Sequence, residues 1–128
     1  MIVFDASVLI AHLDAGDVHH ERATALLADA GGEALGASPL TLSEVLVGPA
    51  RAGQLDRATS VLDQLHIATQ WLSADAPVRL ASLRAETKLK LPDCCVLFAA
   101  EQTQAALATF DHRLAATAEQ RGLAVLDR

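Results

Sequence analysis

The stretch Ile2-Val-Phe-Asp5-Ala-Ser7-Val-Leu-Ile10, which follows Met1, is an apolar run interrupted by one acid. The run over residues 2–5 is short, mainly apolar and rich in β-branched side chains, which predicts a buried strand. A helix is expected over residues 6–13, because the breaker Asp14-Ala-Gly-Asp17 follows it. A strand that passes directly into a helix is typical of an α/β fold, and it leaves Asp5 at the end of the strand.

The same alternation of short apolar runs and amphipathic stretches continues along the chain. Strands are expected at residues 35–38, 66–70, 106–110 and 123–126, and the more polar run 66–70 suits an edge strand. Helices are expected over residues 19–30, 41–47, 55–65, 75–89, 92–104 and 113–121. Thr41 is the expected N-cap of the helix over 41–47, and Gly48-Pro49 is expected to end or kink it.

Strands separated by helices require crossover connections, and therefore a parallel sheet covered on both faces. We expect a three-layer α/β/α domain with about five strands, and a single domain over residues 1–128.

Composition excludes several classes of protein. With 52% hydrophobic and 20% charged residues, the chain is not disordered. Its formal charge of −6 argues against a broad basic face that coats nucleic acid. Neither a basic signal-peptide region nor a run of about 20 apolar residues is present, so we expect a soluble, cytoplasmic protein. Cys94 and Cys95 are interpreted as small buried hydrophobes in a reducing compartment.

Four acids stand out by their position. Asp5 and Asp111 follow apolar runs that are expected to be strands, whereas Glu44 and Asp93 lie in the first turns of expected helices. In a parallel sheet, the carboxyl ends of strands and the starts of helices share one edge, where ligands usually bind. All four carboxylates are therefore candidates for one pocket.

Each acid also has a simpler interpretation. Thr41-Leu-Ser-Glu44 fits a capping box, Asp93 could compensate the helix dipole, and Asp5 and Asp111 could be plain N-caps. Capping does not require four acids to converge, however, and crowded like charges are tolerated mainly when a cation binds. A set of carboxylate oxygens favours Mg²⁺ or Mn²⁺.

Four segments resemble the motifs of PIN-domain ribonucleases. They are Val3-Phe-Asp5-Ala-Ser7-Val-Leu-Ile10, Leu42-Ser-Glu44-Val-Leu, Leu91-Pro92-Asp93 and Thr109-Phe-Asp111-His-Arg-Leu114. Their order and spacing resemble the VapC toxins of type II toxin–antitoxin pairs, over essentially the whole chain. The resemblance implies that the first strand is central and lies beside the strand ending at Phe110.

The resemblance also implies roles for particular residues. Asp5, Glu44, Asp93 and Asp111 would be the catalytic, metal-binding acids, and Ser7 and Thr109 would orient a carboxylate or a water. The expected activity is a Mg²⁺- or Mn²⁺-dependent endoribonuclease, in which metal-activated water attacks the phosphodiester and leaves a 5′-phosphate and a 3′-hydroxyl. The expected partners are an RNA substrate, a cognate antitoxin and a second copy of the chain.

Basic residues near these acids have two interpretations. Lys88, Lys90 and Arg113 could contact RNA phosphates. Alternatively, the basic residues around 79–90 form a solvated helix face with i,i+4 pairs such as Asp75 with Arg79 or Glu86 with Lys90.

Other functions remain open at this stage. One is a housekeeping PIN nuclease in RNA processing, and another is a non-catalytic module whose acidic pocket captures a basic peptide. A phosphotransfer receiver is excluded, because it needs paired acids after the first strand and a late Lys. Here Asp5 is followed by Ala6-Ser7, and no Lys follows Lys90.

Overall fold

The sheet in this computed structural model is built from five short parallel strands in the order β3-β2-β1-β4-β5. The structure describes residues 1–126, so the last two residues of the expected domain lie outside the described residues. The strands are β1 (Ile2–Phe4), β2 (Leu35–Ala37), β3 (Ile67–Thr69), β4 (Ala106–Ala108) and β5 (Val125–Leu126). The central place of β1 beside β4, and the edge position of β3, are as the sequence predicted.

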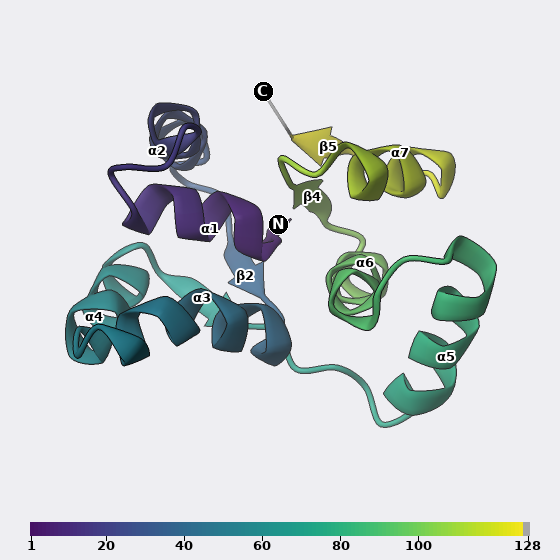
Figure 1. Cartoon of the computed structure of the whole chain (residues 1–128). Coiled ribbons are helices and arrows are strands. Elements are labelled where there is room, and N and C mark those ends of the chain that lie inside the picture. The colour runs from purple at the N-terminus through teal and green to yellow at the C-terminus, as the bar shows by residue number, and fades with distance from the viewer. Residues whose placement is uncertain (127–128) are drawn as a thin grey trace.

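Seven helices cover the sheet within residues 1–126. They are α1 (Ala6–Leu13), α2 (His20–Asp29), α3 (Pro39–Arg51), α4 (Leu55–Gln64), α5 (Ala76–Thr87), α6 (Leu91–Thr103) and α7 (His112–Gln120). Figure 1 shows α1 to α4 on one side of the strands and α5 to α7 on the other. The predicted three-layer α/β/α fold is confirmed. No helix of the described chain is long and apolar enough to cross a membrane.

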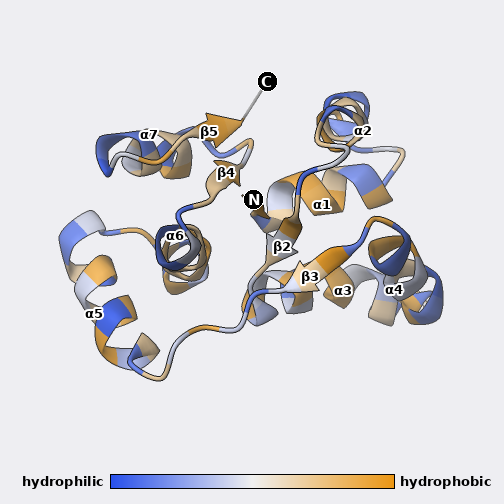
Figure 2. Ribbon diagram, turned by 180° about the vertical axis from the view of Figure 1, so that it is seen from behind, coloured by the Kyte–Doolittle hydropathy of each residue, from blue (hydrophilic) through white to orange (hydrophobic). Residues whose placement is uncertain are grey.

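Side chains that alternate along β1 feed two separate cores. Ile2 and Phe4 pack with α1, α2 and α3, whereas Val3 packs with Leu107 of β4 against α6. This alternation follows from the two-residue period of a strand. Helices such as α5 and α7 carry hydrophobic and hydrophilic residues in turn, as expected of the outer layers (Figure 2).

Helix α6 is the most buried helix of the second core. Its run from Cys94 to Ala100 is buried throughout, and both cysteines are free. The interpretation of Cys94 and Cys95 as small buried hydrophobes agrees with this placement.

The start of α3 differs from the prediction. The N-cap is Ser38, not Thr41, and the Ser38 hydroxyl accepts a hydrogen bond from the Thr41 backbone N–H at 3.1 Å. Pro39 occupies the first helical position, where its fixed φ is favourable and its missing N–H costs nothing. The capping box between Thr41 and Glu44 is therefore wrong, and Glu44 lies in the second turn rather than the first.

The end of α3 also differs. The helix continues through Pro49 to Arg51, so the expected end near Val47 is wrong. Backbone bonding resumes directly after the proline, because Ala52 N–H donates to the Gly48 carbonyl at 3.0 Å and Gln54 N–H to the Pro49 carbonyl at 2.8 Å. Gly53, with a φ of 70°, then supplies the left-handed residue that ends the segment.

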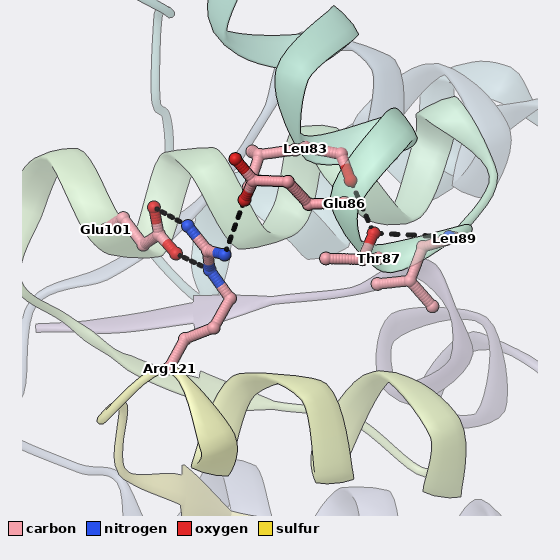
Figure 3. A network of polar contacts seen from close by, with 6 residues as sticks. All are labelled: Leu83, Glu86, Thr87, Leu89, Glu101 and Arg121. Carbon is pink, nitrogen blue, oxygen red and sulfur yellow. Dashed lines mark hydrogen bonds and ion pairs between the residues drawn. The ribbon is translucent and has the colours of Figure 1, made fainter.

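The two ion pairs that were expected around α5 have different outcomes. Arg79 pairs with Asp75 at 4.0 Å, as the i,i+4 interpretation predicted. Glu86 instead binds Arg121, which follows α7 and also binds Glu101 of α6 at 2.5 Å (Figure 3). Arg121 thus ties α5, α6 and the end of α7 together, and the expected pairing of Glu86 with Lys90 is replaced.

Candidate active site

Asp5 lies at the centre of the candidate site, at the end of the central strand. Its carboxylate caps α1, where Oδ1 accepts the Val8 N–H at 3.3 Å, and the residue is only 5% exposed. Burial raises the pKa of Asp5, and repulsion from Asp93 raises it further, against the opposing effect of hydrogen bonds. A buried acid with a raised pKa at a sheet edge marks a functional candidate.

Two hydroxyls orient the Asp5 carboxylate. Ser7 Oγ donates to Asp5 Oδ1 at 2.6 Å, and Thr109 Oγ1 donates to Asp5 Oδ2. Each hydroxyl also accepts a backbone N–H, Ser7 from Phe110 at 3.1 Å and Thr109 from Asp111 at 2.9 Å. The turn between β4 and α7 is therefore joined to Asp5 by two parallel relays, and both carboxylate oxygens have a fixed direction.

Asp111 is fixed by the start of α7. Its Oδ1 accepts the N–H groups of Arg113 at 2.9 Å and Leu114 at 3.1 Å, so it is the N-cap, and it is exposed to solvent. The simpler interpretation of Asp111 as an N-cap is correct, and so is that of Asp5. A carboxylate has about four acceptor positions, and the capping bonds occupy only some of them. A residue that caps a helix can therefore also bind a cation.

Glu44 and Asp93 come from the helices on opposite sides of the sheet. Burial raises the pKa of Glu44, with further repulsion from Asp93 and then Asp5. Burial also raises the pKa of Asp93, together with repulsion from Asp111. Asp93 is thus electrostatically coupled to all three other acids. The four carboxylates that the sequence singled out belong to one electrostatic cluster.

The predicted basic residues lie at the rim of this cluster. Lys90 and Arg113 partly offset the rise in the pKa of Asp93, so both are close enough to stabilise its charge. Lys88 and Lys90 are exposed, and Lys88 is the left-handed residue after α5, with a φ of 61°. Arg113 Nη2 also donates to the Lys88 carbonyl at 3.4 Å, a structural contact that the sequence did not indicate.

The donor set fits a hard divalent cation in its chemistry. Asp and Glu oxygens are what Mg²⁺ and Mn²⁺ prefer, and the mutual repulsion of the carboxylates is what a cation would relieve. Among residues 1–126, no three His, Cys, Asp or Glu side chains are drawn together into a coordination shell. The acids converge on one edge, therefore, without being in ligating contact.

Sequence reasoning missed two residues beside the site. Arg84 and Thr87 bond the backbone of residues 88–89, just ahead of the helix that carries Asp93. Arg84 stood out only as one charge of a basic stretch, and no local motif marks a side chain that binds carbonyls.

Comparison with known proteins adds a family match. A family model described as the PIN domain matches residues 2–120 of the chain. A search of curated protein sequences gave no significant match.

Solved structures resemble the chain over most of its length. A toxin–antitoxin complex from Klebsiella pneumoniae has 30% sequence identity and a TM-score of 0.70, covering 87% of each chain. The sarcin-ricin loop cleaving toxin VapC20 of Mycobacterium tuberculosis has 17% identity and a TM-score of 0.74, covering 91% of this chain and 95% of its own. VapBC2 from Rickettsia felis, solved with a promoter DNA fragment, has 17% identity, a TM-score of 0.69 and 98% coverage of both chains. The last two show a shared fold.

Proposed function

The chain belongs to the PIN domain family, and on that premise we propose that it is a cytoplasmic, metal-dependent endoribonuclease, the toxin of a toxin–antitoxin pair. The observation that carries the proposal is the coupling of Asp93 to Asp5, Glu44 and Asp111 at one sheet edge. Four like charges from four elements destabilise a fold unless they serve a ligand. A cationic cofactor and a phosphodiester substrate account for all of them.

The proposed cofactor is Mg²⁺ or Mn²⁺, held by Asp5, Glu44, Asp93 and Asp111. When bound, such an ion lowers the pKa of a water molecule and neutralises charge on the phosphate. It is also the group that reconciles a cluster of acids with a polyanionic substrate, in a chain whose formal charge is −6.

The chain's own residues orient this chemistry. Ser7 and Thr109 aim the two Asp5 oxygens, and the resulting rigidity limits reorganisation when the substrate arrives. Lys90 and Arg113, at the rim, attract the RNA backbone, and Lys88 extends the same basic edge. We propose that cleavage leaves a 5′-phosphate and a 3′-hydroxyl.

The proposed regulator is a small antitoxin protein. The relative from Klebsiella pneumoniae at 30% identity is a toxin–antitoxin complex, which supports such a partner. An Arg of the antitoxin could bind the carboxylates in a bidentate manner and exclude the metal. Capture of the tagged chain from its native host should recover a small protein whose presence abolishes cleavage. A complex with full nuclease activity would overturn the proposed regulation.

Mapping of RNA 5′ ends in cells tests the proposed activity. Brief induction of the parent chain should produce new 5′-phosphate ends at a small set of RNA positions, and induction of Asp5→Asn should not. The same ends in both cultures would show that the cleavage belongs to another enzyme.

A further inference from the structure

The turn between α5 and α6 delivers Asp93 to the site, and it is held by side chains from outside the turn. It consists of Lys88, Leu89 and Lys90, and Asp93 is the third residue of the helix that follows. The inference drawn from it rests on the proposed function, because it concerns the placement of one of the proposed metal ligands.

Helix α6 starts differently from the other helices that carry site residues. The side chains of Asp5, Ser38 and Asp111 cap α1, α3 and α7. The N-cap position of α6 is Lys90, which makes no side-chain capping bond in the described structure. The position of this helix start, and of Asp93 with it, must be set by other contacts.

Arg84 supplies the strongest of these contacts. Its Nη1 donates to the Lys88 carbonyl at 3.1 Å and to the Leu89 carbonyl at 2.7 Å. Arg113, from α7, adds a bond to the same Lys88 carbonyl at 3.4 Å. Both bonds to Lys88 restrain a non-glycine residue in the left-handed region, a conformation that persists only when its surroundings enforce it.

Thr87 binds a backbone N–H group of the turn, whereas Arg84 binds its carbonyl groups. Its hydroxyl donates to the Leu83 carbonyl at 2.6 Å and accepts the Leu89 N–H at 3.2 Å (Figure 3). Leu89 is 2% exposed, so its peptide groups need protein partners. Arg84 takes the carbonyl of Leu89 and Thr87 takes its N–H, which leaves this residue little freedom.

We propose that Arg84 is a positioning residue for Asp93: its two bonds to the turn, with the Thr87 bond opposite, set where α6 begins and so where the Asp93 carboxylate meets the other acids. The bracing of Asp5 by Ser7 and Thr109 involves neither α5 nor α6. Loss of the Arg84 bonds should therefore displace Asp93 while it leaves the rest of the site in place.

A purely electrostatic role and a positioning role predict opposite changes in metal affinity when Arg84 is replaced by a neutral residue. Arg84 is a cation whose charge acts on Cys94, the residue after Asp93, so its removal should strengthen binding of a divalent cation if charge alone mattered. If Arg84 positions Asp93, its removal should weaken that binding. Residues that orient a metal ligand without touching the metal commonly contribute ten-fold or more to metal affinity.

The test is Mn²⁺ binding to the purified full chain by isothermal titration calorimetry, without RNA. We expect Arg84→Gln to bind Mn²⁺ about ten-fold more weakly than the parent. Arg79→Gln, a control on the same helix that loses the same charge and an ion pair with Asp75, should bind like the parent. Thr87→Val should follow Arg84→Gln, and Thr87→Ser, which keeps the hydroxyl, should follow the parent.

The outcomes separate the two claims. Unchanged or tighter Mn²⁺ binding by both Arg84→Gln and Thr87→Val would overturn the positioning role, whatever their melting temperatures. A parent chain that binds no Mn²⁺ would instead overturn the metal-dependent function itself. If Arg84→Gln does not fold, the Thr87→Val and Thr87→Ser pair decides the matter alone.

Discussion

The Asp5 carboxylate accepts a hydrogen bond from the hydroxyl of Thr109, a residue 104 positions further along the chain. Both residues are buried, and they follow neighbouring parallel strands, β1 and β4. The same hydroxyl accepts the Asp111 N–H, so one side chain fixes the direction of a buried acid and the start of the helix that Asp111 caps. Strand pairing and site geometry are coupled through this contact.

Two replacements of Thr109 should distinguish the effect of its hydroxyl group from the effect of its size. Thr109→Val keeps the volume but leaves one Asp5 oxygen and the Asp111 N–H without this partner, which should cost about 1–3 kcal/mol of unfolding free energy. It should also weaken Mn²⁺ binding by ten-fold or more. Urea titration and calorimetry measure the two effects.

Thr109→Ser is the matched control, because it keeps the hydroxyl and loses only a buried methyl group. It should cost about 1 kcal/mol and retain most of the metal affinity. Equal Mn²⁺ affinities for the Val and Ser variants would mean that the hydroxyl has no part in the site.

Neutralisation of Asp93 should stabilise the chain in the absence of metal. Burial and repulsion from Asp111 raise the pKa of Asp93, so the folded state binds a proton at Asp93 more tightly than the unfolded state does. The corresponding stability is present at low pH and is lost as pH rises through the raised pKa. Near neutral pH, Asp93→Asn should therefore be more stable than the parent by roughly 0.5–1 kcal/mol, a value reduced by solvent screening of a half-exposed group.

Asp56→Asn provides the control for this comparison, because Asp56 is also an acid in the first turn of a helix, α4. It should not stabilise the chain. Millimolar Mg²⁺ should raise the melting temperature of the parent and of Asp56→Asn by mass action, and that of Asp93→Asn much less. Equal shifts in all three proteins would reduce Asp93 to a residue that compensates the helix dipole.

The architecture was predictable because its signals are local. Short β-branched runs between amphipathic stretches indicate strands and helices, and the alternation of the two fixes a parallel sheet with Asp5 at its carboxyl edge. The start of α3 was misplaced, because Ser38-Pro39 and Thr41 both resemble helix starts, and the choice depends on which hydroxyl accepts a backbone N–H of the first turn.

The acids of the candidate site were recognisable for the same reason, because each follows a strand or lies near the start of a helix. Ser7 and Thr109 were also indicated, by the resemblance to PIN-domain motifs, and both donate to the Asp5 carboxylate. Arg84 and Thr87 were not. Arg84 acts on carbonyls four and five positions ahead, and Thr87 acts on an N–H two positions ahead. Such contacts between side chains and the backbone depend on the finished turn, and no spacing in the sequence encodes them.

A histidine pair outside the site should make stability depend on pH. The rings of His12 and His20 stack with centroids 6.2 Å apart, and burial, with the neighbouring His20, lowers the pKa of His12 from its ordinary value near 6.5. The unfolded state then binds a proton more readily than the folded state, so stability should fall as pH drops below about 6.5.

His12→Gln should lose part of this dependence. The difference in unfolding free energy between pH 7.5 and pH 5, measured with urea, should be smaller in the variant than in the parent. His112→Gln, at an exposed position on α7, serves as the reference and should retain the parent's difference. Identical pH differences in the parent and His12→Gln would contradict the assignment.

Self-association should involve exposed apolar side chains. Trp71, between β3 and α5, is 75% exposed, and Val78, in the first turn of α5, is 70% exposed. We predict that the chain sediments as a homodimer at micromolar concentration and that Trp71→Ser with Val78→Ser weakens the dimer. A parent chain that remains monomeric at about 100 μM, and so associates by less than about 5.5 kcal/mol, would refute this prediction.

The most direct test of the central claim is cleavage of RNA by the purified chain, with the parent, Asp5→Asn and Asp56→Asn compared at matched Mg²⁺ or Mn²⁺ concentration. Circular dichroism establishes that each protein is folded. We predict that the parent and Asp56→Asn cleave, that a chelator abolishes the cleavage, and that Asp5→Asn is slower by at least about 100-fold, since loss of a metal ligand removes a few kcal/mol of transition-state stabilisation. Cleavage by folded Asp5→Asn at the parental rate, or cleavage that persists in the chelator, would contradict the account.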